Sequence, residues 1–221
     1  MTRLLDIFFS LIALIALMPI FLVLIPLLRL TGEGKVFYRQ ERVGASGRLF
    51  YVLKFATMLE NSPNIGSGTI TIDNDPRILP MGHFLRRSKI NELPQIINIL
   101  VGDMSLIGPR PLTPDNFAFY STEQQKAITQ VRPGLSGLAS IFFRNEDKYL
   151  TRASDPRVFY RQIITPMKGN LEVWYVERNN ISMYFILITF TILVVLRPSS
   201  LRYLPRIYPD LSTFFEKIND I

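Results

Sequence analysis

The sequence contains no cysteine and only one histidine, His83. Without cysteine the chain can form neither a disulfide bond nor a thiolate metal site. A lone histidine argues against a histidine-based metal cluster. The absence of cysteine also fits a protein that faces the cytosol.

Charge and hydropathy point to anionic partners and a membrane. The 221 residues carry 25 Lys and Arg against 18 Asp and Glu, which gives a net charge of +7 and a pI near 9.8. This balance suits nucleic acid, phosphorylated substrates or an anionic membrane surface. The hydrophobic fraction of 48% favours the membrane. A chain of this length can hold one domain with a proper core, or a small domain plus membrane elements.

The longest apolar run extends from Ile7 to Leu28. At about 1.5 Å per residue it is long enough to cross a hydrocarbon core of about 30 Å. A cleaved signal peptide is disfavoured, because the run is too long and no small-residue cleavage site follows it before Arg29. Two interpretations remain, a straight transmembrane helix and a helix broken at Pro19, since proline removes one backbone hydrogen bond.

Charged residues help to orient this run. Before it, Arg3 is opposed by Asp6, and after it four cations follow closely, namely Arg29, Lys35, Arg39 and Arg42. The positive-inside rule therefore places the C-terminal side in the cytoplasm. A spanning helix then has its N-terminus outside, whereas a helix that turns back at Pro19 keeps both ends inside.

The stretch from Arg86 to Pro111 concentrates the chemistry of the chain. Apolar residues at helical spacing predict a helix here, and they are Leu93, Ile96, Ile97 and Leu100. Asn91 occupies the position of an N-cap and Pro94 lies in the first turn. We therefore expect the helix to begin at Glu92.

The start of this helix is predicted to bind phosphate. A helix N-terminus offers unpaired N–H groups and a partial positive charge, and three cations lie just upstream, Arg86, Arg87 and Lys89. Downstream, prolines fix the backbone on both sides of Arg110, whose planar guanidinium suits a phosphate or a carboxylate. Glu92 is the one carboxylate at the centre. In an alternative interpretation without a catalytic role, Glu92 is an ordinary acid in the first turn that complements the helix dipole.

Several runs in this sequence resemble the bacterial sugar transferase family, the monotopic phosphoglycosyl transferases. The two that carry the likeness are NELPQ at 91–95 and GDMSLIGPRP at 102–111. The others are FYRQERVG at 37–44, LKF at 53–55, DPR at 75–77, FLRR at 84–87 and VRPGLSGL at 131–138. These runs follow one another in the family's order, and the resemblance as a whole covers roughly residues 1 to 145.

The resemblance implies an activity and a membrane topology. Members move a sugar 1-phosphate from a UDP-sugar to a polyprenyl phosphate such as undecaprenyl phosphate, release UMP and use Mg²⁺. A carboxylate nucleophile divides this displacement into two steps. The family's re-entrant helix dips into one leaflet and leaves by the same face, which favours a turn at Pro19, although Met18 stands where serine is common.

The resemblance also carries site residues onto this chain. The family's catalytic Asp-Glu pair falls on Asn91 and Glu92, and Glu92 is the expected Mg²⁺ ligand. The expected phosphate-binding residues are Lys54, Arg86, Arg110 and Arg144. Besides Met18 and Asn91, three positions depart from the family pattern, because Ala56 replaces a common arginine and Ile186 and Ile188 replace a common Asp and Lys.

Asn91 is the departure that matters most, because an amide is not a competent nucleophile. Asparagine caps a helix about as well as aspartate, so the substitution leaves the fold intact. Four explanations are open: an engineered change, a natural variant that uses Glu92 as nucleophile, direct transfer without a covalent intermediate, or an inactive protein. Of these, a natural variant that uses Glu92 as nucleophile ranks first.

Other patterns predict the remaining elements. Extended segments are expected at 36–38, 49–55 and 69–72, with a hairpin turn at 44–48, and a helix is expected at 113–130. The basic-aromatic run Phe142-Phe143-Arg144 would also suit a nucleic acid base, an interpretation that the leading membrane segment disfavours. The apolar run 181–196 is expected to be an interfacial or buried helix, and the tail 201–221 to dock on the membrane or mediate self-association.

We therefore predict an α/β, mainly helical protein with a re-entrant membrane helix at 1–30, a small cytosolic catalytic domain at 31–180 and a C-terminal interfacial helix and tail at 181–221. The predicted location is the cytoplasmic face of a bacterial inner membrane, and the predicted role is the first membrane step of exopolysaccharide, capsule or O-antigen assembly. Expected partners are a UDP-sugar, polyprenyl phosphate, the membrane and a second copy of the chain, but no nucleic acid. The alternative is an inactive scaffold or regulator that keeps the fold.

Overall fold

The computed structural model describes residues 2–65 and 75–219, and this part is mainly helical, as the sequence predicts. The helices are α1 (Thr2–Leu30), α2 (Pro80–Arg87), α3 (Gln95–Val101), α4 (Pro114–Phe117), α5 (Thr122–Ile128), α6 (Leu138–Phe142), α7 (Glu146–Arg152), α8 (Pro156–Phe159), α9 (Thr165–Arg178), α10 (Ile181–Leu196), α11 (Leu204–Ile207) and α12 (Ser212–Asn219). The strands are β1 (Phe37–Val43), β2 (Leu49–Phe55), β3 (Ser105–Ile107) and β4 (Gly134–Ser136).

The four strands form two small sheets. Strands β1 and β2 form an antiparallel hairpin in which Phe37 pairs with Phe55 and Val43 with Leu49, so the predicted strand 49–55 and the turn 44–48 are confirmed. Strands β3 and β4 pair in parallel. The predicted strand at 69–72 lies outside the described residues.

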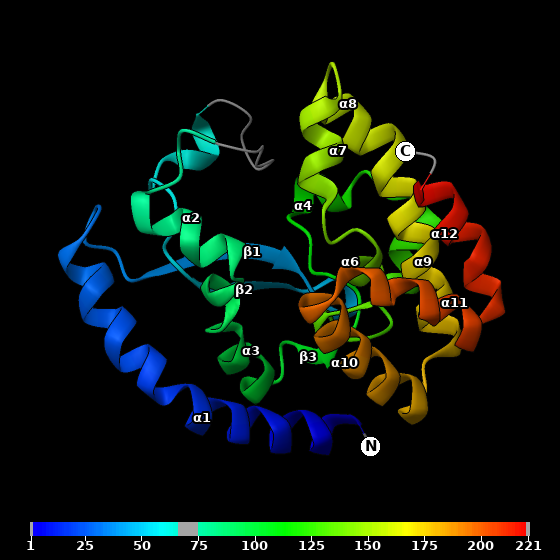
Figure 1. Ribbon diagram of the computed structural model, residues 1–221, viewed down its shortest axis with the longest axis horizontal. Helices are drawn as coiled ribbons and strands as arrows, with labels where there is room; N and C mark the ends of the chain where they lie inside the picture. The colour runs from blue at the N-terminus through cyan, green and yellow to red at the C-terminus, as the bar shows by residue number, and fades with distance from the viewer. Residues whose placement is uncertain (1, 66–74, 220–221) are drawn as a thin grey trace.

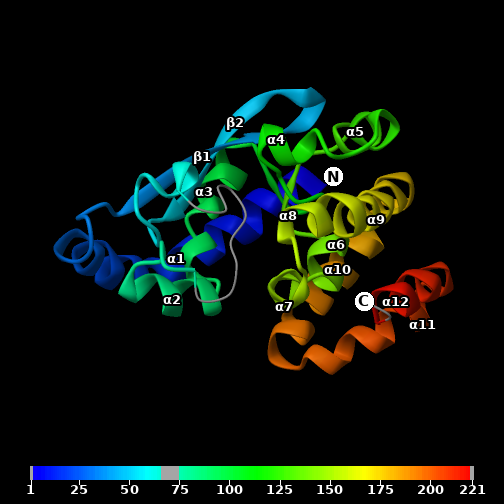
Figure 2. The same ribbon diagram turned by 90° about the horizontal axis from the view of Figure 1, so that it is seen from above.

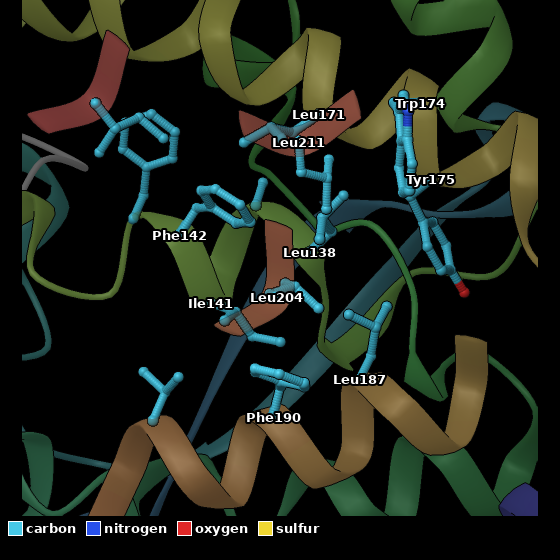
Figure 3. Packing of buried hydrophobic residues seen from close by; sticks show 14 of the residues in the cluster. Leu138, Ile141, Phe142, Leu171, Trp174, Tyr175, Leu187, Phe190, Leu204 and Leu211 are labelled. Atoms are coloured by element: carbon cyan, nitrogen blue, oxygen red, sulfur yellow. The ribbon is translucent and has the colours of Figure 1, made fainter. Parts of the chain in front are cut away.

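The largest core surrounds α6, α9 and α10, whose inward faces interdigitate (Figure 3). Its fully buried members include Leu138, Leu171 and Leu187. The C-terminal tail joins this core through Leu204 and Leu211, each with 0% exposure. Residues 181–219 therefore pack against the same core as α9.

Helix α1 curves around one side of the rest of the chain (Figure 1). It is the one helix in the described part of the chain that is long and apolar enough to cross a membrane, and both Pro19 and Pro26 lie inside it. Most of its apolar side chains are exposed, whereas Asp6 near its start is buried. The helix is thus a candidate for membrane insertion with a polar attachment at its first turns.

Both ends of α1 contact the rest of the chain. Near the N-terminus, Arg3 donates to the carbonyl oxygens of Ile99 and Leu100 at the end of α3. Near the C-terminus, Leu24 and Leu28 pack in a cluster with Phe55 and Leu85. The middle of the helix has no such cluster among the described residues, so its apolar surface remains uncovered.

A buried carboxylate anchors the first turns of α1. Asp6 accepts hydrogen bonds from the Ser105 hydroxyl, the Leu106 N–H and the Tyr184 hydroxyl, at 2.9 to 3.0 Å. These donors come from β3 and α10, which ties three distant parts of the sequence together. Hydrogen bonds to a charged group are among the stronger ones in proteins.

Two predicted helices need correction. The helix expected to begin at Glu92 with Asn91 as its N-cap begins at Gln95, after a separate 3-10 turn over Ile90–Glu92. That turn starts because Lys89 adopts a left-handed conformation with φ of +61°. The single helix expected over 113–130 is two helices, α4 and α5, because Ser121 forms a capping box with Gln124 and starts the chain again.

Candidate functional site

The candidate site lies where strand β2, the end of α2 and the turn before α3 meet. Strand β2 is joined to α3 by the Asn98 side chain, which donates to the Tyr51 carbonyl at 2.8 Å and accepts from the Leu53 N–H at 2.9 Å. This pairing fixes the strand that carries Lys54 beside the turn that carries Glu92. Sequence reasoning missed Asn98, although its place on the polar face of the helix marks it.

Glu92 is the centre of the site. Its Oε1 atom lies 2.7 Å from the Arg110 guanidinium and 3.3 Å from the Lys54 ammonium, while Oε2 takes part in neither ion pair. The Glu92 side chain is 12% exposed. Three of the residues predicted from the sequence are therefore brought into direct contact.

The ion pairs set the protonation state of Glu92. Burial alone would raise the pKa of this carboxyl, but attraction by Arg110 and Lys54 outweighs burial and holds the pKa of Glu92 well below its usual range. Attraction by Glu92 also raises the pKa of Arg110. Glu92 is consequently ionised at neutral pH and Arg110 carries a full positive charge.

Lys54 responds in the opposite way. Burial lowers its pKa to about 7, since the attraction of Glu92 is partly cancelled by the nearby charges of Arg42 and Arg110. A lysine in this state gains its full charge when an additional anion enters the site. The site therefore favours an anionic ligand.

Two further cations surround the same carboxylate. Arg42 donates to the carbonyl of Pro111 at 2.9 Å, and burial lowers its pKa to about 10. Lys89 lies within electrostatic reach of Glu92, and burial lowers its pKa as well. Lys89 is one of the cations that the sequence places just before the predicted phosphate site. Arg42 was not singled out as a site residue, and its place in the FYRQERVG run was the available signal.

Arg86 and Arg144 lie farther from Glu92 than Lys54 and Arg110. The Arg86 guanidinium contacts the Met58 sulfur at 3.4 Å, and Glu92 influences it electrostatically. Arg144 is half-buried, and within the described ranges it forms no recorded hydrogen bond or ion pair with the other site residues. The structure thus places Arg86 beside the cationic cluster and, in the part of the chain it describes, shows no ion pair that ties Arg144 to it.

Asn91 is buried beside Glu92, with 6% exposure. Its side-chain oxygen is enclosed and has no hydrogen-bond donor in the part of the chain that the structure describes. An enclosed amide oxygen without a partner is costly unless a ligand satisfies it. Asn91 does not cap a helix here, which removes the structural role expected for it.

A residue of α9 accepts a hydrogen bond from the turn that carries Arg110. The Arg110 N–H donates to Glu172 at 3.2 Å, and Glu172 has 1% exposure. Burial raises the pKa of Glu172 to about 8. Gly108 is needed at this turn because the backbone of Arg132 to Gly134 passes within van der Waals distance, leaving no room for a side chain.

Lys168 lies one helical turn before Glu172 on α9 and supports the segment after Arg144. It forms an ion pair with Glu146 at the start of α7, and its ammonium lies over the Phe143 and Tyr160 rings. Sequence reasoning missed Lys168 and Glu172. Their spacing of four residues along a helix with many apolar residues was the available signal.

A shallow pocket opens on the cationic side of this arrangement. Its lining residues are Arg42, Val52, Lys54, Gln95, Arg110 and Pro111. Three cations therefore face one hollow. The hollow itself is small, about 10 Å³. Its guanidinium and ammonium groups are of the kind that donate charge-assisted hydrogen bonds to phosphate oxygens.

The donor set bears on the expected Mg²⁺. The described residues contain no cluster of three or more His, Cys, Asp or Glu side chains that could hold a metal ion. Mg²⁺ is commonly bound through one or two carboxylates together with substrate phosphates. Glu92 and the partnerless Asn91 oxygen fit that mode, provided that a ligand supplies the phosphate oxygens.

Comparison with known proteins gives a consistent result. A family model described as bacterial sugar transferase matches residues 1–198. The exopolysaccharide production protein ExoY of Sinorhizobium fredii is 36% identical over 163 residues, which cover 67% of this chain and 72% of that protein.

Longer relatives match over a part of their length. The UDP-glucose:undecaprenyl-phosphate glucose-1-phosphate transferase of Xanthomonas campestris is 38% identical over 162 residues, covering 70% of this chain and 32% of that protein. The undecaprenyl-phosphate galactose phosphotransferase of Salmonella typhimurium is 32% identical over 170 residues, covering 69% of this chain and 32% of that protein. The chain spans about one third of each of these two relatives.

Proposed function

Because the chain belongs to the bacterial sugar transferase family, we propose that it moves a sugar 1-phosphate from a UDP-sugar to a polyprenyl phosphate and releases UMP. Undecaprenyl phosphate is the proposed acceptor, since two relatives carry that lipid in their names. The reaction begins the assembly of a surface glycan at the cytoplasmic face of the bacterial inner membrane.

The observation that carries this proposal is the excess of positive charge around one ionised carboxylate. Lys54 and Arg110 contact Glu92, and Arg42, Arg86 and Lys89 influence it electrostatically. Five basic residues surround one acid, so positive charge remains to balance a diphosphate after Glu92 is paired. Cations placed around the transferring group are a recurring means of stabilising charge in phosphoryl transfer.

In the proposed reaction, Oε2 of Glu92 attacks the phosphorus that carries the sugar. The bond from that phosphorus to the UMP oxygen breaks, and UMP leaves with the electron pair. A phosphate oxygen of the lipid then attacks the same phosphorus and returns the carboxylate to Glu92. Arg110 and Lys54 hold Oε1 in place and stabilise the negative charge on the transferred group.

Mg²⁺ belongs to the proposal as the ion that neutralises the diphosphate when it is bound. Glu92 and the amide oxygen of Asn91 are the protein oxygens that would hold it. Asn91 also enforces the use of Glu92, because its amide cannot attack phosphorus.

The cationic residues of the site lie close to the apolar helix α1, where the lipid acceptor would be found. Lys54 and Arg86 are each adjacent in sequence to a residue, Phe55 or Leu85, that packs on Leu24 and Leu28 of α1. The cationic cluster is thereby tied to the apolar helix. We propose that α1 is re-entrant, since both of its ends are attached to the same domain.

The test is UMP release by the full chain in lipid nanodiscs with undecaprenyl phosphate, for a panel of UDP-sugars. The proposal expects release by the wild type, loss on Glu92→Gln, and a phosphosugar adduct on Glu92 in intact-mass spectra. Glu177→Gln is the matched control, because Glu177 is an exposed acid on α9. The removal of a catalytic nucleophile lowers the rate by several orders of magnitude.

Asn91→Asp separates the proposal from its main rival, a membrane scaffold that has lost catalysis. The observation that favours the rival is the amide at the position where the family has aspartate. If the wild type is inert with every donor and Asn91→Asp releases UMP, the scaffold interpretation is correct and Glu92 is not the nucleophile.

A further inference from the structure

The chain after α10 carries a basic surface that the site does not use. Between residues 181 and 209 there is no Asp or Glu, while three arginines occur, Arg197, Arg202 and Arg206. All three are exposed, as is Tyr203. We refer to these four residues as the arginine–tyrosine surface. Most of the segment follows residue 198, where the match to the family model ends.

Two of the three arginines lie over one aromatic ring, and the third, Arg197, donates to the Ser199 hydroxyl at 3.2 Å and acts on that ring only through its charge. The guanidinium carbons of Arg202 and Arg206 lie 4.9 and 5.1 Å from the centre of the Tyr203 ring, and Arg202 also donates to the Tyr203 hydroxyl at 2.9 Å. That hydrogen bond and the charges of Arg202, Arg206 and Arg197 lower the pKa of Tyr203. In the described part of the chain, no ion pair with an acid is recorded for any of the three arginines.

An exposed apolar face leads directly to this surface. On α10, Phe185, Ile192 and Leu196 are 43%, 56% and 77% exposed, and their spacing places them on one side of the helix. Phe9 of α1 packs edge-on against Phe185, with ring centres 6.3 Å apart. The uncovered apolar surface of α1 therefore continues along α10 and ends at Leu196, immediately before Arg197.

This order of features is typical of a membrane interface. Apolar residues enter the acyl region, tyrosine lies at the level of the headgroups, and arginine faces anionic phosphates. Ile207, which is 48% exposed, adds an apolar side chain beside Arg206. Charge complementarity and continuity with α1 both point to the bilayer that receives α1.

We propose that the arginine–tyrosine surface binds the headgroups of anionic lipids and thereby docks the segment 197–207 on the membrane that holds α1. The buried side of the same segment, through Leu204, belongs to the core. The segment follows α10 and leads into α11 beside the core helices (Figure 2), so docking orients the whole domain rather than a loose tail. The proposal is independent of the transfer reaction, since none of these residues lies in the site.

The absence of cysteine allows a direct test. Ile207→Cys in the full chain is labelled with an environment-sensitive fluorophore, and the protein is placed in nanodiscs of phosphatidylcholine with or without phosphatidylglycerol. We expect a blue-shifted emission and quenching by brominated lipids when phosphatidylglycerol is present. The docking equilibrium should weaken about 100-fold when Arg197, Arg202 and Arg206 are all changed to Gln, at about fivefold for each arginine.

The matched control removes the same charge elsewhere, through Arg48→Gln, Arg152→Gln and Arg157→Gln, three exposed arginines outside this surface. The proposal is overturned if phosphatidylglycerol leaves the emission unchanged, or if the control triple variant weakens docking as much as the first. Thermal unfolding of both triple variants shows whether either has lost its fold.

Discussion

Glu172 shows how a buried residue outside the predicted site supports one inside it. Its carboxyl accepts the Arg110 N–H and faces four titratable groups, those of Arg110, Lys168, Tyr120 and Tyr175. Its second oxygen is enclosed and has no recorded partner among the described residues. The fold thus keeps a carboxyl in an environment that favours its neutral form.

Glu172→Gln is expected to stabilise the protein at pH 8 and to have little effect near pH 4. Burial raises the pKa of Glu172 from 4.5 to about 8. Between pH 4.5 and about 8, Glu172 is ionised in the unfolded chain but neutral in the folded protein. Its contribution to the free energy of unfolding therefore falls as the pH rises through this range. Glutamine keeps an acceptor for Arg110 and does not ionise.

The measurement is thermal unfolding in detergent at pH 4, 6 and 8, with Glu177→Gln as the exposed control. A difference in unfolding temperature between Glu172→Gln and wild type that stays constant over this range would contradict the prediction. Glu172→Leu removes the acceptor and is expected to lower UMP release at every pH, because it frees the Arg110 turn.

At the scale of elements, strands β3 and β4 position Arg110 by bringing two backbones together. A Cβ on Gly134 would lie 2.1 Å from the Gly108 nitrogen and 2.3 Å from the Ser136 oxygen. Both atoms belong to backbone and cannot move aside cheaply. Gly108 begins the turn through Pro109 to Arg110, so a displacement there reaches the site.

Gly134→Ala is therefore expected to destabilise the protein by about 1–3 kcal/mol or more, and to lower UMP release beyond the loss of folded protein. Such a change lowers the unfolding temperature by about 2–4 °C per kcal/mol in a domain of this size. Gly47→Asn is the control, because no atom lies within 4 Å of a Cβ there and asparagine tolerates its φ of +73°. An unchanged unfolding temperature for Gly134→Ala would contradict the packing argument.

Asp6 joins α1 to β3 and α10, so its removal should loosen that attachment. Asp6→Ala leaves three buried donors without an acceptor and is expected to cost about 3 kcal/mol. Asp6→Asn keeps an acceptor and should cost less. Proteolysis in nanodiscs measures the release of α1, with Asp115→Ala, an exposed acid, as control. Equal protection of Asp6→Ala and wild type would show that the anchor is dispensable.

Local patterns predicted strand β2, the turn before it and the bounds of α10, because these depend on neighbours in sequence. The strand expected at 36–38 was too short, since β1 extends over Phe37–Val43. The predicted start of α3 at Glu92 was wrong, because the spacing of apolar residues does not distinguish the two kinds of helix. Leu93 and Ile96 keep the same face in a 3-10 turn and in an α-helix, and the left-handed Lys89 has no sequence marker. Glu172 was missed because it meets Arg110 across 62 residues of chain. Glu92, Lys54 and Arg110 come together as expected, although their catalytic roles stay predictions.

At the scale of the whole molecule, α1 is attached to the domain at both ends. Arg3 and Asp6 bind α3, β3 and α10, while Leu24 and Leu28 pack against β2 and α2. A straight span would carry Arg3 and Asp6 to the opposite side of the bilayer and break their contacts with α3, β3 and α10. The anchored ends instead favour a helix that enters and leaves by one face.

Single-cysteine variants should report this topology, since the natural chain has no background thiol. In inverted inner-membrane vesicles, Thr2→Cys and Arg48→Cys are both expected to react with a membrane-impermeant maleimide, because both sites face the domain side. Met18→Cys, near the middle of the exposed apolar stretch, should react after detergent is added. In spheroplasts none of the three should react. Labelling of Thr2→Cys from the outer face of spheroplasts would instead establish a spanning helix. The contacts of Arg3 and Asp6 with α3, β3 and α10 could then not exist in the membrane-inserted protein.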